Sequence, residues 1–172
     1  NLNNEMSVKA ANLSYRRIAW NLGLTYQLIE FSDLTKNTTN YSNYSQNGIS
    51  LSYSHRLSSR VSARFGASNN VKEDRDGSRT TSNSASINLL ASVIPSRFNL
   101  NIFSSYGTNL TEKKEGTAQK NDMMLNNNLE ATFFFGDKTN IAAGGSYVIY
   151  DDRLGITGYT DISAILRLNI NF

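Results

Sequence analysis

The chain contains one histidine, His55, and it is the first residue to consider for acid–base chemistry. Hydrolytic sites need a nucleophile or an activated water beside a base, most often a histidine with a carboxylate. His55 continues an alternating run with Leu51 and Tyr53, so its side chain is expected on their apolar face. Asp151 and Asp152 are adjacent, and consecutive strand residues face opposite ways, so they do not form a catalytic pair. We therefore predict no catalytic residues and no enzymatic activity.

Metal, cofactor and nucleic-acid sites are also not expected. The chain has no cysteine and no cluster of metal-ligating residues, and it lacks a glycine-rich phosphate loop. Its net charge is +3 with a pI near 9.2, but basic and acidic residues are mixed in segments such as "VKEDRDGSR" and "TEKKEGTAQKND". A nucleic-acid groove would require clustered basic residues with stacking aromatics. We predict no metal, no cofactor and no nucleic-acid partner.

The dominant pattern in the chain is an alternation of apolar and polar residues, which is typical of β-strands. Apart from the shorter run at 61–67, the runs have about 9–12 residues, close to the ~9–11 that a tilted strand needs to cross a bilayer. No segment shows helical periodicity, and none approaches the ~20 apolar residues of a membrane helix. The sequence therefore predicts an all-β protein with eight clear strands. The runs lie at 18–28, 49–57, 61–67, 85–93, 98–106, 125–135, 141–149 and 162–172.

The two faces of these strands differ in composition. Apolar residues gather on one face, and the other face carries mainly Ser, Asn, Thr and Gly. This distribution does not fill the core of a sandwich, but it suits a wall with lipid on one side and water on the other. The residues expected to face lipid at mid-strand are Leu22, Leu51, Leu89, Leu129 and Leu166. The residues expected to face the lumen include Ser52, Arg64, Asn101, Asn128, Glu130, Gly144 and Arg167.

The connections between the runs also alternate in length. Short turns are predicted at 57–60, 94–97 and 136–139, and longer polar loops at 32–46, 69–81, 108–122 and 151–158. Aromatic residues are expected to form girdles at the two membrane interfaces. The girdle at the short-turn end comprises Trp20, Phe98, Phe133, Phe135 and Phe172, and the girdle at the long-loop end Tyr26, Tyr106, Tyr147 and Tyr159.

With these features, residues 17–172 resemble bacterial outer-membrane β-barrel proteins of the Gram-negative type. In that family the last strand typically ends in Phe and carries alternating apolar residues that the barrel-assembly machinery recognises, and "LRLNINF" fits this pattern. The resemblance implies a transmembrane antiparallel up-and-down β-barrel in the outer membrane. It also implies contact with the lipid bilayer and lipopolysaccharide, and with the assembly machinery during biogenesis. It identifies no subfamily.

Residues 1–16 leave the strand number open. Met6, Val8 and Ala10 alternate, and Leu13 and Tyr15 follow after a shift of phase, so this segment is either an extra N-terminal strand or lies outside the wall. Eight strands close antiparallel, whereas nine would place the first parallel to the last, which single-chain bacterial barrels avoid. The small inward residues favour the C-terminal part of a larger barrel, and the chain length favours eight strands.

Two functions follow from a barrel with a polar interior. The first is a pore or channel, or part of one, for small polar solutes. The second is a structural or assembly barrel that anchors or threads a partner protein, holds a plug in its lumen, or displays surface loops.

One specific contact is predicted on the inward face. Glu130 and Arg167 lie at similar heights on strands separated by one strand, which presents Gly144 between them. Neighbouring strands are about 4.8 Å apart, so the two backbones stand roughly 10 Å apart, within reach of two long side chains. We predict that Glu130 pairs with Arg167 across Gly144, with Arg64 as the competing partner.

Overall fold

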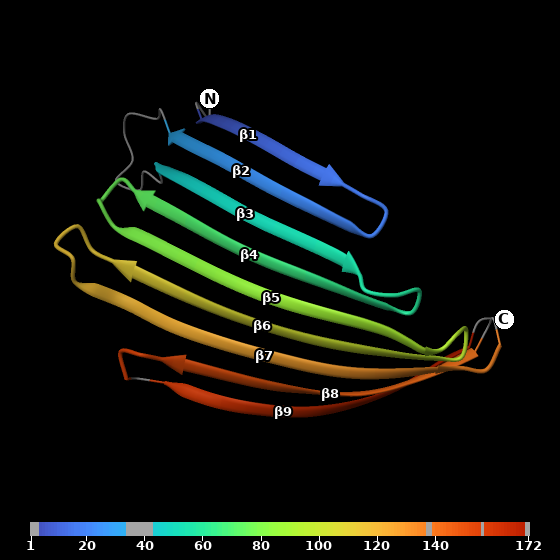
Figure 1. Cartoon of the computed structure of the whole chain (residues 1–172). Helices are drawn as coiled ribbons and strands as arrows, with labels where there is room; N and C mark the ends of the chain where they lie inside the picture. Colours follow the sequence, from blue (N-terminus) through green and yellow to red (C-terminus); the bar gives the residue numbers. More distant parts are fainter. Residues whose placement is uncertain (1–3, 34–42, 137–138, 156, 171–172) are drawn as a thin grey trace.

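The computed structural model describes residues 4–33, 43–136, 139–155 and 157–170, which form a single antiparallel sheet (Figure 1). The nine strands follow one another in the sheet in chain order, so the topology is up-and-down, and none of the described residues is helical. The strands are β1 (Asn4–Arg16), β2 (Trp20–Asp33), β3 (Tyr44–Arg56), β4 (Val61–Asp74), β5 (Arg79–Ile94), β6 (Phe98–Glu112), β7 (Ala118–Phe134), β8 (Thr139–Asp152) and β9 (Gly158–Ile170).

The eight predicted strands correspond to β2–β9, and residues 4–16 add a ninth strand, β1. β1 pairs with β2 along its whole length, which excludes the alternative that this segment lies outside the sheet. Its register runs without a shift, so the change of phase in the apolar pattern moves the apolar side chains from one face of β1 to the other. Leu13 pairs with Leu24 on the apolar face, whereas Met6 pairs with Phe31 on the opposite face.

The predicted long loops at 69–81 and 108–122 are mostly strand in the structure. β4 and β5 are joined by residues 75–78 alone, and β6 and β7 by residues 113–117. These strand ends are polar on both faces, and cross-strand pairs such as Asn69–Asn83 (Nδ2 to Oδ1, 2.7 Å) hold them together. The apolar alternation ends where both faces can meet water, so composition alone suggested loops. Much of the expected loop at 32–46 lies outside the described residues.

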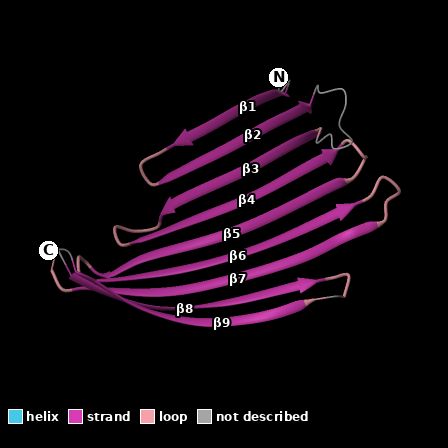
Figure 2. Ribbon diagram, turned by 180° about the vertical axis from the view of Figure 1, so that it is seen from behind, coloured by secondary structure: helices cyan, strands magenta, loops and turns pink. Residues whose placement is uncertain are grey.

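The strands are staggered along the sheet. Followed from partner to partner, the strand pairing leads from Trp20, at the start of β2, to Leu129, which lies well inside β7. The partners on the way include His55, Ala63 and Leu89. Successive hairpins are therefore displaced along the strand direction, as Figures 1 and 2 show. A stagger of this kind accompanies strand tilt in barrel walls. The sheet bends into an arc, but it does not close, because β1 and β9 each pair with one neighbour only.

The molecule has almost no core. Among the described residues only Ala63, Ala142 and Asp122 are buried, and no large side chain is fully buried. The chain exposes 12173 Å², whereas a folded soluble monomer of 19.1 kDa exposes roughly 8,400 Å² by the usual scaling. A sheet normally buries one face against another layer. This sheet has no second layer among its described residues, so its side chains divide into two open faces.

Candidate functional site

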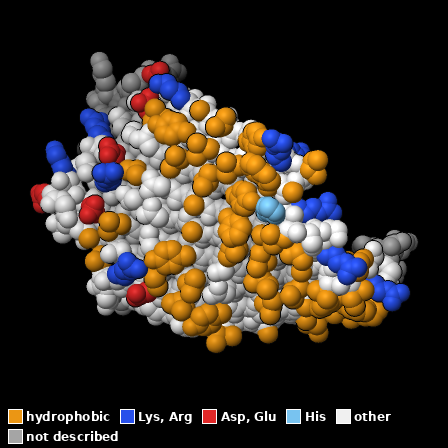
Figure 3. Space-filling model, in the orientation of Figure 1, with side chains coloured by type: hydrophobic (Ala, Val, Ile, Leu, Met, Phe, Trp, Pro, Cys, Tyr) orange, Lys and Arg blue, Asp and Glu red, His pale blue; other side chains and the backbone are white. Residues whose placement is uncertain are grey.

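One face of the sheet is a broad apolar surface. Figure 3 shows hydrophobic side chains across its whole width. At mid-strand, Leu51 is 46% exposed, Leu129 51% and Leu166 77%. Apolar patches on soluble monomers rarely exceed a few hundred Å². This surface therefore requires a cover, such as lipid or another protein layer.

Aromatic residues cluster at the short-turn end of the apolar face. The ring centroids of Phe133 and Phe135 are 4.8 Å apart, and those of Phe98 and Phe133 are 6.5 Å apart. A separate pair lies on the β1–β2 hairpin, where the ring centroids of Trp20 and Tyr15 are 5.1 Å apart. Both groups lie at the short-turn end of the apolar face, where the sequence predicts a girdle. Phe172, the last residue predicted for it, lies outside the described residues.

Toward the loop end, the tyrosine hydroxyls have polar partners. Tyr26 donates from its hydroxyl to Asn47 Oδ1 at 3.2 Å, and Tyr106 accepts from Arg153 Nη2 at 3.3 Å. Tyr147 also lies on the apolar face, since it pairs with Ile162. The prediction for Tyr159 is wrong. It pairs with Tyr150 on the polar face, where the two rings stack with centroids 5.3 Å apart.

The other face, here called the polar face, is held together by side chains that bond across the strands. Hydroxyl pairs join Ser68 to Ser84 at 2.8 Å and Ser146 to Ser163 at 2.6 Å. Such pairs fix register and satisfy partly enclosed polar groups. The register places all seven predicted lumen residues on this face. They are Ser52, Arg64, Asn101, Asn128, Glu130, Gly144 and Arg167.

The polar face is the inner side of the arc. Along β6, Ile102 and Tyr106 on the apolar face are exposed, whereas Asn101, Phe103 and Ser105 on the polar face are partly buried. Bending a sheet brings the side chains of its inner side together and spreads those of its outer side. The polar network is thus the more enclosed surface.

The ion pair predicted between Glu130 and Arg167 is present. Arg167 Nη2 donates to Glu130 Oε2, and the carboxylate side chain is 30% exposed. Gly144 lies between them, paired with Glu130 on one side and Ile165 on the other. A Cβ at Gly144 would stand 2.7 Å from the carbonyl oxygen of Leu129, so only glycine fits this approach. Arg64, the competing partner, makes no ion pair with any described residue.

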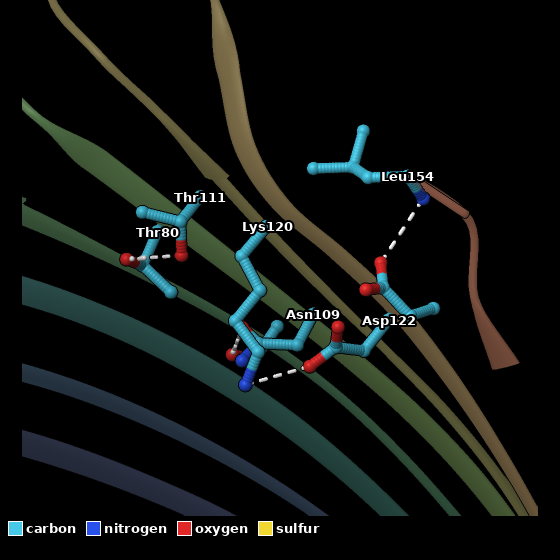
Figure 4. A network of polar contacts seen from close by, with 8 residues as sticks. Thr80, Asn109, Thr111, Lys120, Asp122 and Leu154 are labelled. Atoms are coloured by element: carbon cyan, nitrogen blue, oxygen red, sulfur yellow. Dashed lines mark hydrogen bonds and ion pairs between the residues drawn. The ribbon is translucent and has the colours of Figure 1, made fainter. Parts of the chain in front are cut away.

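A second polar network lies on the same face near the loop end (Figure 4). Lys120 Nζ pairs with Asp122 Oδ2 at 2.6 Å, and the Asp122 side chain is almost fully buried. Thr80 and Thr111 share a hydrogen bond of 3.1 Å on the adjacent strands. These contacts stabilise the polar strand extensions.

The turn at 75–78, beyond the end of β4, has its own polar contacts. The Ser78 amide donates to Asp76 Oδ1 at 2.8 Å. Hydrogen bonds from Ser78 hold the pKa of the Asp76 carboxyl below its usual value.

The candidates for acid–base chemistry are not brought together. His55 lies on the apolar face, where its Nδ1 is 2.7 Å from the Tyr53 hydroxyl. Asp152 pairs with Asp122 on the polar face, and Asp151 lies on the apolar face opposite Met123. The described residues contain no group of three or more acidic, histidine or cysteine residues that could hold a metal ion.

Two features were not predicted from the sequence. Five arginines gather at the short-turn end of β1–β4, and a small apolar island interrupts the polar face at the opposite end of β1–β3. The arginines are Arg16, Arg17, Arg56, Arg60 and Arg64. The island comprises Met6, Val8, Ile29, Phe31 and Tyr44. The arginine group had one signal in the sequence, the repeated placement of arginine beside a short turn, in "YRRIAW" and "HRLSSR".

No protein-family model matches the chain, and no curated protein matches it. Among the residues that the structure describes, no helix is long and apolar enough to cross a membrane.

Proposed function

We propose that the chain forms part of the wall of a bacterial outer-membrane β-barrel, with the apolar face against lipid. The observation that carries this proposal is the pairing of a coreless sheet with a continuous exposed apolar surface, on a chain that exposes 12173 Å². Lipid would cover that surface without any second protein layer. The alternation of faces along every strand is the arrangement that a bilayer-spanning barrel requires.

The spacing of the aromatic rows supports a bilayer-spanning wall. On the apolar face Phe133 pairs with Phe98, and Leu125 pairs with Tyr106 further along the same two strands. Residues 125 to 133 at ~3.4 Å per residue, with a strand tilt of about 40°, span roughly 20 Å along the membrane normal. The apolar band of outer-membrane barrels is about 25 Å tall. Leu129 and its partner Ile102 stand midway between the two rows.

Closure of the barrel requires strands beyond the nine described. β1 and β9 run in the same direction, because the strands alternate and their number is odd. Both have an unpaired edge along 13 residues. Unpaired strand edges of this length pair with other strands unless they are covered. We therefore propose that an odd number of additional strands joins these edges, which gives a barrel of more than nine strands.

The polar face would then line a water-filled passage. Its side chains are mostly small, and barrels wider than about eight strands leave space inside them. Ser, Asn and Thr offer donors and acceptors without a dominant charge, which suits small polar solutes. The proposed function is therefore a pore or channel, or part of one, for such solutes.

Planar-bilayer conductance tests the pore. The sample is the barrel closed by the additional strands, and it is expected to give discrete conductance steps. Asn128→Trp, on the polar face, should reduce the step size, because it fills the passage. Leu129→Trp, one residue along on the apolar face, should leave the steps unchanged. Absence of steps from protein that migrates as folded would contradict the pore.

The apolar island favours a second candidate, a barrel that holds a partner or plug. Phe31 and Tyr44 stack with ring centroids 5.6 Å apart, and Lys72 Nζ lies 4.8 Å from the Tyr44 centroid. Met6 and Val8 are about half exposed beside them. An exposed apolar surface on a mainly polar face suits contact with another protein segment. A silent bilayer recording would favour this structural or assembly role.

A further inference from the structure

The five arginines at the short-turn end line one hollow on the sheet, here called the arginine groove. Its volume is about 680 Å³, which lies within the usual range of small-ligand pockets. Arg16 and Arg56 are the last residues of β1 and β3, Arg64 lies in β4, and Arg17 and Arg60 lie in the turns that follow β1 and precede β4. Asn21, Ser54 and Ser62 contribute polar groups to its lining.

The register fixes how the guanidinium groups surround the groove. Arg16 pairs with Asn21, Asn21 with Ser54, and Ser54 with Arg64, so these residues form one row across β1–β4. Three strand spacings of about 4.8 Å separate Arg16 from Arg64 by roughly 14 Å. Arg56 pairs with Ser62 and is therefore the diagonal neighbour of Arg64, at about 7–8 Å between backbones. Cationic groups thus stand on both sides of the hollow.

The groove has no acidic counterpart. None of the described residues that line it is Asp or Glu. The ion pairs among the described residues all lie elsewhere in the sheet. On the apolar face, Figure 3 shows basic and no acidic side chains coloured at the short-turn end, and both kinds at the loop end.

The arginines themselves differ in their contacts. Arg17 Nε donates to the Tyr15 hydroxyl at 2.6 Å, and the guanidinium lies 5.7 Å from the centre of that ring. Arg56 and Arg64 have no ion pair with the described residues, in contrast to Arg167, which is paired with Glu130. Arginine remains charged at every physiological pH, so crowding these groups without counterions is unfavourable. An anion with several oxygens would relieve that repulsion through bidentate hydrogen bonds.

We propose that the arginine groove binds small multivalent anions, namely phosphorylated or polycarboxylate solutes. Serine and asparagine groups at Ser54, Ser62 and Asn21 supply donors for the remaining oxygens. This proposal concerns binding at the polar face, so it holds whether or not the sheet encloses a conducting passage.

Calorimetric titration of the full chain, refolded in detergent, tests the groove. Pyrophosphate and citrate are the probes, each in a background of chloride. Saturable binding of pyrophosphate is expected. Arg56→Gln combined with Arg64→Gln should weaken it at least tenfold. Lys113→Gln combined with Lys114→Gln is the matched control, since it removes the same charge from the β6–β7 turn and should leave the affinity within about twofold.

The results show which class of anion binds, and they either support or overturn the proposal. Tighter binding of pyrophosphate than of citrate identifies phosphorylated solutes, and equal binding identifies polyanions in general; both support the groove if affinity depends on Arg56 and Arg64. If that double variant does not fold, Arg16→Gln combined with Arg60→Gln replaces it. Absence of saturable binding by the unmodified chain, or equal weakening by the lysine control, would overturn the proposal.

Discussion

Leu129→Arg is expected to lower the free energy of unfolding by about 2–4 kcal/mol in lipid vesicles, the cost of a cation near the bilayer midplane. Leu129 is 51% exposed on the apolar face and lies midway between the aromatic rows. If the face meets lipid, the guanidinium must leave water or distort the bilayer to reach it. Urea titration of the vesicle-embedded protein, followed by heat-modifiable gel mobility, measures the change.

Asn128→Arg is the matched control for this substitution. Asn128 is the preceding residue of β7, it is also exposed, and it points to the polar face. Arginine there would remain hydrated, so the loss should stay below about 1 kcal/mol. Comparable losses at Leu129 and Asn128 would show that the two faces meet the same medium.

Gly144→Ala is expected to lower the free energy of unfolding by about 1–3 kcal/mol, because the new methyl group overpacks a closed contact. The added Cβ would lie 2.7 Å from the Leu129 carbonyl oxygen, which belongs to the neighbouring strand and cannot move aside freely. The displaced backbone would also disturb the strand that carries Glu130 toward Arg167. Equilibrium unfolding in detergent or vesicles gives the magnitude.

Gly107→Ala tests whether that loss is specific. Gly107 lies on the polar face of β6, and a Cβ there would meet its nearest neighbour, the Asn83 carbonyl oxygen, at 3.6 Å, an ordinary contact. Alanine restricts the unfolded chain, so this substitution should be neutral or stabilising by up to about 1 kcal/mol. A loss at Gly107 as large as that at Gly144 would mean that any side chain on the polar face is disfavoured, not that Gly144 occupies a special position.

The strands and their faces could be predicted because alternation acts residue by residue. The position of Glu130 on β7 and Arg167 on β9 followed from register alone, and the pair is present. Each strand's register is pinned by one apolar face, so a shift of one residue would turn every Leu toward the wrong side. Local patterns of this kind need no knowledge of distant contacts.

Other features could not be predicted from the alternation of apolar and polar residues. The prediction of long loops at 69–81 and 108–122 was wrong because paired polar strands, such as those carrying Asn69 and Asn83, resemble loops in composition. The arginine groove spans the four strands β1–β4, whose stagger brings Arg16 and Arg64 into one row. Tyr159 was assigned to the wrong face because it was placed by its height alone, whereas alternation counted back from Ile162 puts it on the polar face.

Side-chain accessibility in lipid tests the central claim most directly, and the absence of native cysteine makes single-cysteine labelling straightforward. Two pairs of consecutive residues are suitable for labelling, Asn128 with Leu129 and Ile165 with Leu166. All four residues are exposed on the sheet itself. In vesicles, cysteine at Asn128 or Ile165 should react with a water-soluble maleimide, and cysteine at Leu129 or Leu166 should not until the protein is unfolded. Ile165 is decisive, because it is apolar but lies on the polar face. Equal labelling of both members of each pair would contradict a sheet with lipid on one face and water on the other.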